Sequence, residues 1–274
     1  MQHPSAPITQ AAVWAANAEC HDALSCTHDS LASHIAKQNC RVFYQELINH
    51  ILCRFDVKPA RVLELGCGTG TYSHLLPGHY TGIDLSEGMI AAARKNCSNG
   101  EFTVSSAEEF LRRGNKYDLI FSSSFLHHIF NLDELFALVA DSLGSGGAYV
   151  GIHEPLRKEF SRDRTPISQV ADDVFGVALG WDIEPMPVRK RLRLALRRLT
   201  GAISGEPQES NANIDLVDFQ LNSRFGPSCV HNAASKAGLK GNILIYSYLR
   251  FEAIRVFLGG CRNYFAFLAV KEKE

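Results

Sequence analysis

The chain has 274 residues and a formal net charge of −1, with 28 Lys and Arg against 29 Asp and Glu. Hydrophobic residues make up 46% of it, an ordinary share for a globular protein with a sizeable core. The charge balance offers no overall attraction for nucleic acid, and no stretch reaches the ~18 uninterrupted apolar residues of a membrane span. The composition therefore predicts a globular, cytoplasmic protein and argues against nucleic acid as its partner.

The eight cysteines are scattered and form no CxxC pair, and no histidines stand near them at zinc-binding intervals. We expect reduced thiols that fill apolar space, and the sequence implies no metal.

The first 58 residues precede the main pattern of strands and helices. A polar, Pro-punctuated start is followed by a helical stretch over about 31–55, in which apolar residues recur at helical spacing. We expect an N-terminal helical segment or lid in residues 1–58. Phe43 and Tyr44 are either lid residues that face a ligand or ordinary core residues.

The segment 62–71 is an apolar strand that runs into a loop with Gly66, Gly68 and Gly70 at alternate positions. Glycine lets the backbone bend tightly and approach a ligand that a side chain would push away. The spacing differs from the dinucleotide fingerprint, so no pyrophosphate is implied. Glu64, two positions before the first glycine, would attract a cationic or hydroxyl-rich ligand instead.

Glu64 and the three glycines resemble the first motif of the class I S-adenosylmethionine-dependent methyltransferases. Asp84 ends a second short strand over 80–85, where a carboxylate can accept hydrogen bonds from both ribose hydroxyls. Members of this family usually place an Asp after the third strand to hold the adenine amino group, whereas this chain has Ser106. That difference puts the adenine contact on Ser106 or on backbone groups of Ala107 and Glu108.

The resemblance implies S-adenosylmethionine as the cofactor and a set of residues that bind it. This set is Glu64, Gly66, Cys67, Gly68, Thr69, Gly70, Asp84, Leu85, Met89, Ser106, Ala107, Glu108 and Ser122.

Strands and helices alternate after the loop. We expect a helix over about 86–96, strands near 102–105, 117–123 and 148–152, and two last strands at 242–248 and 264–270. Asn131 and Glu134 have capping-box spacing for a helix that ends near Leu143. The order predicts an α/β fold with a doubly wound, seven-stranded, mostly parallel sheet, the Rossmann-like methyltransferase fold, with N-terminal helices and a helical cap insert.

The predicted division of the chain follows from this order. Residues 1–58 form the lid, 59–156 the cofactor-binding core, 157–227 the cap insert that selects the substrate, and 228–274 the part that completes the sheet.

Within the cap insert, residues 189–198 carry six basic side chains on a broad face opposite an apolar one. The segment is interpreted either as a cap helix with a solvated charged face or as a contact to an anionic membrane or anionic substrate.

Polar residues at the ends of the fourth and fifth strands are the candidate catalytic groups. A hydroxyl acceptor needs a base, and histidine takes up a proton near neutral pH. The candidates are His127, His128, His153 and Glu154, each with the alternative of a structural role. The segment 122–125 lacks the Asn/Asp-Pro-Pro-aromatic pattern of enzymes that methylate exocyclic or amide nitrogens, which argues against that class.

These features favour methyl transfer to a hydroxyl group of a small-molecule or lipid-like acceptor with a His base. Two alternatives stay open. One is an RNA or protein methyltransferase guided by the basic segment 189–198, and the other is a protein of this fold that binds the cofactor or an apolar ligand without transferring methyl. The sequence names neither the acceptor nor the oligomeric state.

Overall fold

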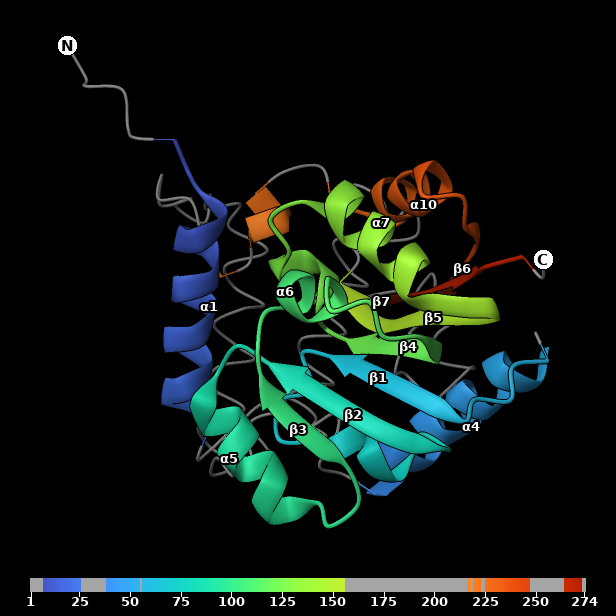
Figure 1. Cartoon of the computed structure of the whole chain (residues 1–274), viewed down its shortest axis with the longest axis horizontal. Helices are drawn as coiled ribbons and strands as arrows, with labels where there is room; N and C mark the ends of the chain where they lie inside the picture. The colour runs from blue at the N-terminus through green and yellow to red at the C-terminus, as the bar shows by residue number, and fades with distance from the viewer. Residues whose placement is uncertain are drawn as a thin grey trace, which may run out of the picture.

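The computed structural model describes residues 7–25, 38–54, 56–155, 216–217, 219–222, 225–246 and 264–272. A seven-stranded sheet with the order β3-β2-β1-β4-β5-β7-β6 forms its centre (Figure 1). The strands are β1 (Arg61–Leu65), β2 (His79–Asp84), β3 (Glu101–Val104), β4 (Tyr117–Ser123), β5 (Leu143–Pro155), β6 (Lys240–Tyr246) and β7 (Tyr264–Val270). The helices are α1 (Gln10–Leu24), α4 (Gln38–Arg54), α5 (Glu87–Asn96), α6 (Ala107–Leu111), α7 (Leu132–Ser142) and α10 (Pro227–Lys236), with short 3-10 turns η1 (Thr71–His74), η2 (Leu126–His128) and η4 (Phe219–Asn222).

Strands β1 to β5 are parallel, and only the pairs β5–β7 and β6–β7 are antiparallel. The chain order runs outward from β1 on one side and from β4 on the other. The carboxyl ends of β1 and β4 therefore form the switch point at which open α/β sheets bind their ligands. The predicted α/β, doubly wound sheet is confirmed.

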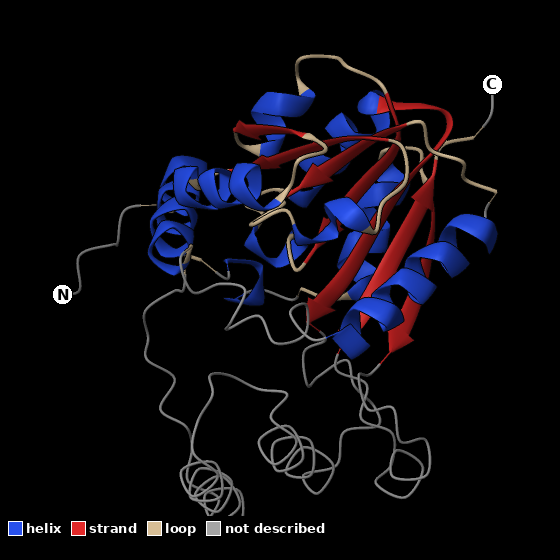
Figure 2. Cartoon of the chain, turned by 90° about the horizontal axis from the view of Figure 1, so that it is seen from below, coloured by secondary structure: helices blue, strands red, loops and turns tan. Residues whose placement is uncertain are grey.

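Helices cover both faces of the sheet, as Figure 2 shows from below, and two hydrophobic clusters lie between the helices and the sheet. Side chains of α4 and α5 pack with Val62 and Phe121 on one face. Side chains of α6, α7 and α10 pack with Leu63 and Leu65 on the other. Successive strand residues point to opposite faces, and both faces are covered, so β1 is apolar almost throughout. Arg61 at the start of β1 is exposed, and Glu64 is the charged residue that is buried within the strand, at 1% exposed.

Two expectations about the elements differ from the structure, and the structure decides one alternative that the sequence left open. Residues 10–24 form a helix, α1, where the sequence suggested only a polar start. Strand β5 begins at Leu143 rather than at 148, because Leu143 pairs with Tyr117 beside a register shift in β4. Tyr44 is a core residue, 1% exposed, and its ring packs edge-on against Tyr72.

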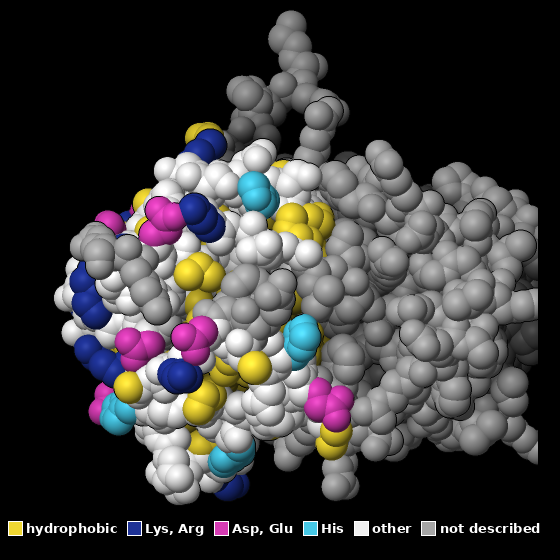
Figure 3. Space-filling model, turned by 90° about the vertical axis from the view of Figure 1, so that its right-hand side faces the viewer, with side chains coloured by type: hydrophobic (Ala, Val, Ile, Leu, Met, Phe, Trp, Pro, Cys, Tyr) yellow, Lys and Arg dark blue, Asp and Glu magenta, His cyan; other side chains and the backbone are white. Residues whose placement is uncertain are grey.

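Most of the predicted cap insert, including the basic segment 189–198, lies outside the described residues. Among the residues that the structure does describe, no helix is long and apolar enough to cross a membrane. On the face of the molecule in Figure 3, basic and acidic side chains stand side by side on the described surface. The ion pair of Lys236 with Asp133, at 2.6 Å, is of this mixed kind.

Candidate active site

The loop after β1 is held in its tight shape by left-handed backbone at all three alternating glycines. Gly66, Gly68 and Gly70 have φ of 67°, 51° and 79°. A Cβ on Gly66 would lie 2.6 Å from the ring of Phe125, and one on Gly70 would lie 2.8 Å from Sγ of Cys97. Gly66 therefore lets the turn after β4 approach the loop, whereas Gly70 lets the loop pack on α5.

Asp84 at the end of β2 joins this loop to the start of α5. Its Oδ2 accepts a hydrogen bond of 2.9 Å from the Gly68 amide, and its Oδ1 accepts one of 2.9 Å from the Ser86 amide. The Ser86 hydroxyl in turn accepts from the Met89 amide at 3.0 Å and so caps α5. The carboxylate is thus fixed beside the glycine loop, where a ribose would meet it.

Glu64 lies in the wall of the same cavity, with its carboxyl fully buried. The Tyr80 hydroxyl donates to Oε2 of Glu64 at 2.5 Å. Burial raises the pKa of Glu64 to about 8, against the effect of the Tyr80 hydrogen bond and with the help of the nearby Asp84 charge. A positively charged ligand beside this buried carboxyl would favour its charged form, which suits the ammonium or sulfonium group of S-adenosylmethionine.

The region after β3 presents Ser105, Ala107 and Glu108 to the cavity. Ser106 does not line it, because its hydroxyl accepts a hydrogen bond of 3.2 Å from the Glu109 amide and caps α6. The Glu108 carboxyl is buried, which raises its pKa, and its Oε1 accepts a 3.3 Å hydrogen bond from the Gln10 amide group. Glu108 is therefore better placed than Ser106 to meet an adenine.

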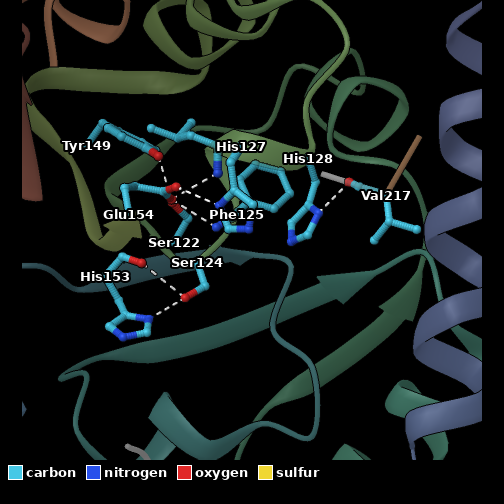
Figure 4. A network of polar contacts seen from close by, with 10 residues as sticks. Ser122, Ser124, Phe125, His127, His128, Tyr149, His153, Glu154 and Val217 are labelled. Atoms are coloured by element: carbon cyan, nitrogen blue, oxygen red, sulfur yellow. Dashed lines mark hydrogen bonds and ion pairs between the residues drawn. The ribbon is translucent and has the colours of Figure 1, made fainter. Parts of the chain in front are cut away.

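The turn η2 after β4 is organised by Glu154, which is 0% exposed (Figure 4). Oε1 of Glu154 accepts hydrogen bonds from the amides of Phe125 and Leu126 at 2.8 and 2.9 Å. Oε2 lies 2.9 Å from Nδ1 of His127. The carboxylate thereby holds three consecutive residues in one conformation, and neither Glu154 nor His127 lines the cavity.

His128, the next residue, does line the cavity, beside Phe125 and Ile129. Its Nδ1 lies 2.6 Å from the Val217 carbonyl oxygen, and because a carbonyl only accepts, Nδ1 carries the proton (Figure 4). In the neutral ring the lone pair then belongs to Nε2. Burial and the neighbouring His127 hold the pKa of His128 well below its usual range, so the ring is neutral at pH 7.

Ser124 and His153 are two non-glycine residues with left-handed backbone, at φ of 50° and 58°. The Ser124 hydroxyl donates to the His153 carbonyl at 3.1 Å and also meets Nδ1 of His153 (Figure 4). Such conformations cost about 1–3 kcal/mol each and persist where surrounding contacts enforce them. Ser124 lines the cavity, whereas His153 supports it from behind.

The helix α1 closes the open side of this cavity across the carboxyl ends of the strands (Figure 1). Trp14, Asn17 and His21 line it from one face of the helix. The ring of His21 lies 5.5 Å from that of His128, edge to face. The sequence analysis predicted a helical stretch only in 31–55 and missed these three residues. The signals that indicate a helix here are the Thr9 cap and the run without Gly or Pro that follows it.

The cavity, about 190 Å³ in volume among the described residues, brings together much of the predicted set. The predicted residues that line it are Glu64, Gly66, Cys67, Gly68, Thr69, Asp84, Leu85, Met89, Ala107, Glu108 and His128. The predicted residues that do not are Gly70, Ser106, Ser122, His127, His153 and Glu154. Ser122 is buried, and its hydroxyl lies 2.6 Å from that of Tyr149.

A glycine loop after β1, a ribose-type carboxylate after β2 and a cavity at the switch point of this sheet define a class I S-adenosylmethionine-dependent methyltransferase domain. Residues 62–147 match the family model described as a methyltransferase domain. The cofactor of this class is S-adenosylmethionine, and the buried Glu64 and the fixed Asp84 fit its positive charge and its ribose.

Two curated relatives that are named methyltransferases match part of the chain. The chain is 28% identical over 147 residues to a trans-aconitate 2-methyltransferase of Variovorax paradoxus, covering 52% of this chain and 54% of that protein. It is 32% identical over 112 residues to a malonyl-[acyl-carrier protein] O-methyltransferase of Geobacter sulfurreducens, covering 38% and 42%. The chain thus spans about half the length of the curated relatives it matches.

Solved structures show the same fold. The magnesium protoporphyrin IX methyltransferase of Synechocystis PCC 6803 aligns over 98% of this chain and 100% of its own, with a TM-score of 0.52 and 12% identity. The plantazolicin methyltransferase aligns over 95% and 96%, with a TM-score of 0.52 and 14% identity. At these identities the likeness concerns the fold alone.

Proposed function

We propose that this protein transfers the methyl group of S-adenosylmethionine to a hydroxyl oxygen of a small-molecule or lipid-like acceptor, with His128 as the general base. S-adenosylmethionine supplies an activated methyl group, so the chain has to hold the acceptor in line with it and exclude water. Glu64, the loop 66–69 and Asp84 hold the cofactor in this proposal.

The position of His128 carries the proposal. It lines the same cavity as the glycine loop, and the Val217 carbonyl directs the Nδ1 proton away from the reaction. The lowered pKa keeps the ring neutral, which is the form that can take a proton from a hydroxyl group. Glu154 supports His128 indirectly, by fixing the turn on which it stands.

The relatives favour a second candidate, methylation of a carboxylate. Trans-aconitate and the malonyl group, which appear in their names, both carry carboxylates. A carboxylate is already deprotonated and needs no base. It would gain from a cation, and no Lys or Arg is among the described residues that line the cavity. This composition of the wall favours the hydroxyl acceptor.

Methyl transfer from radiolabelled S-adenosylmethionine to a panel of trans-aconitate, malonyl-acyl carrier protein, catechols and long-chain alcohols separates the two candidates. Methyl ethers survive mild alkali, whereas methyl esters release methanol. We expect an alkali-stable product, a loss of about 10²–10⁴-fold in turnover for His128→Ala, and unchanged affinity for S-adenosylhomocysteine. His50→Ala, an exposed position on α4, is the matched control.

An alkali-labile product whose formation does not depend on His128 would overturn the proposal in favour of carboxylate methylation. The pH profile gives a second test. With His128 as base, kcat/KM falls only at pH values below 6.5, because the pKa of His128 is lowered from that value.

A further inference from the structure

The N-terminal helix α1 presents a polar face to the cofactor cavity. Trp14, Asn17 and His21 are spaced so that they share one side of the helix, and all three line the cavity. Asn17 is 5% exposed, which is rare for an Asn without a specific role.

The hydrogen bonding of Asn17 leaves an acceptor for a ligand. Its Nδ2 donates to the Val13 carbonyl, one turn earlier in α1, at 2.9 Å. One N–H of this amide group is therefore used within the helix, and the carbonyl oxygen of Asn17 is the acceptor that its side chain offers to the cavity. S-adenosylmethionine carries N–H and O–H donors on its adenine, ribose and ammonium groups.

A second contact attaches α1 to the turn that holds the ribose carboxylate. Oδ1 of Asp22 accepts hydrogen bonds from the Ser86 hydroxyl at 2.5 Å and from the Gly88 amide at 2.9 Å. Ser86 is fully buried, and its own amide donates to Asp84. A chain of hydrogen bonds thus runs from Asp22 through Ser86 and Asp84 to the Gly68 amide.

The other end of α1 is held at the adenine side of the cavity. Gln10 donates from Nε2 to the Glu108 carboxyl, as described above. The helix is therefore attached at both ends to residues that face the cofactor or adjoin those that do. The contacts of Asp22 with Ser86 and Gly88 hold α1 over the cavity. Through Ser86 they also adjoin Asp84, the carboxylate placed to meet the ribose.

We propose that α1 is a cofactor-binding element of this domain, with the Asn17 carbonyl oxygen accepting a hydrogen bond from the cofactor and Asp22 acting as the positioning residue that holds the helix in place. Release of the cofactor then requires that the Asp22 contacts to Ser86 and Gly88 break. The inference rests on cofactor binding and not on the choice of acceptor, so it stands or falls independently of the methylation assays.

Calorimetric titration of the full chain with S-adenosylhomocysteine tests the role of Asn17. We expect Asn17→Ala to weaken binding by about five- to tenfold, the usual effect of one lost hydrogen bond. Glu19→Ala, an exposed position on the same helix, should leave binding unchanged. Adenosine serves as a second ligand: an equal loss for adenosine assigns the contact to the nucleoside, and a loss for S-adenosylhomocysteine alone assigns it to the amino-acid part.

The role of Asp22 is tested by the rate of dissociation and by hydrogen exchange. Asp22 is exposed, so Asp22→Ala leaves the core intact. We expect S-adenosylhomocysteine to dissociate about threefold faster or more from this variant, and amides 10–24 to exchange faster in the ligand complex. Asp22→Ala removes two hydrogen bonds, from the Ser86 hydroxyl and the Gly88 amide, and about threefold is at the lower end of the effect of even one lost hydrogen bond.

Wild-type affinity for both ligands in Asn17→Ala, together with a wild-type dissociation rate in Asp22→Ala, would overturn the proposal. Thermal unfolding of both variants without ligand checks that they fold like the wild type. If Asn17→Ala alone unfolds at a lower midpoint than the wild type, the dissociation rate of Asp22→Ala decides the test.

Discussion

We predict that replacing Glu154 by Ala strongly lowers the free energy of unfolding of this domain. Its carboxylate is fully buried and accepts from the Phe125 and Leu126 amides while it also contacts Nδ1 of His127. In Glu154→Ala these groups lose their partner in a place that water does not reach. The turn that carries His128 then loses the contact that fixes its conformation.

The size of the effect follows from the groups left without a partner. Each buried donor that is left without an acceptor costs about 1–3 kcal/mol. Because the three donors share one carboxylate, we expect a loss of about 3–5 kcal/mol in the free energy of unfolding. For a domain of this size that lowers the unfolding midpoint by about 6–20 °C.

Glu154→Gln separates the hydrogen bonds from the charge. Its carbonyl oxygen can still accept from the two amides, and His127 can change tautomer to accept from the new NH₂ group. We expect this variant to lose less than half as much stability as Glu154→Ala. Glu46→Ala, an exposed position on α4, should change the midpoint little.

Calorimetric or fluorescence-monitored unfolding of the three variants, with and without S-adenosylhomocysteine, measures these differences. If Glu154→Ala unfolded within about 1 °C of the wild type, the reasoning from buried donors would be refuted. If Glu154→Gln were as unstable as Glu154→Ala, the negative charge rather than the hydrogen bonds would be what matters.

Two further perturbations test the cofactor loop. Burial raises the pKa of Glu64 to about 8 from 4.5, so between these pH values the folded state holds a proton that the unfolded state releases. The contribution of Glu64 to stability is therefore greatest below pH 4.5 and falls as the pH rises to about 8. Glu64→Gln should flatten that decline in unfolding experiments, and an equal decline in the variant would exclude Glu64 as its source. Gly66→Ala places a Cβ 2.6 Å from Phe125 at a φ of 67°, whereas Gly114→Ala has a similar φ of 77° and no atom within 4 Å. We therefore expect Gly66→Ala alone to weaken S-adenosylhomocysteine binding, by about tenfold or more, and equal affinities in the two variants would refute the close approach of Phe125 to Gly66 as a requirement for binding.

Local signals in the sequence identified most of the fold and the cofactor side of the site. Apolar runs bounded by Gly and by capping residues located the strands and α7, whose Asn131 cap accepts from the Glu134 amide as the spacing predicts. Alternating glycines and the carboxylates after β1 and β2 are features of short segments, and such segments adopt the same conformation wherever they occur.

The roles of the polar residues after β4 and β5 were decided only by the tertiary structure. The sequence favoured His128 slightly but left His127, His153 and Glu154 open as candidates too, because a single residue's shift in register turns a side chain to the other face of a sheet. The register shift between Gly151 and Glu154, with left-handed backbone at His153, sends the Glu154 carboxylate beneath the turn. His128 alone of the four then lines the cavity.

The same holds for α1. The Thr9 cap and the residues that follow it favour a helix from local sequence alone. The position of α1 over the cavity depends on contacts between residues distant in the chain, such as Asp22 with Ser86. The sequence by itself determined a methyltransferase-type sheet and the segment that meets the cofactor. The tertiary structure decided which side chains share the cavity, because burial and long-range hydrogen bonds exist only once the strands and helices have packed together.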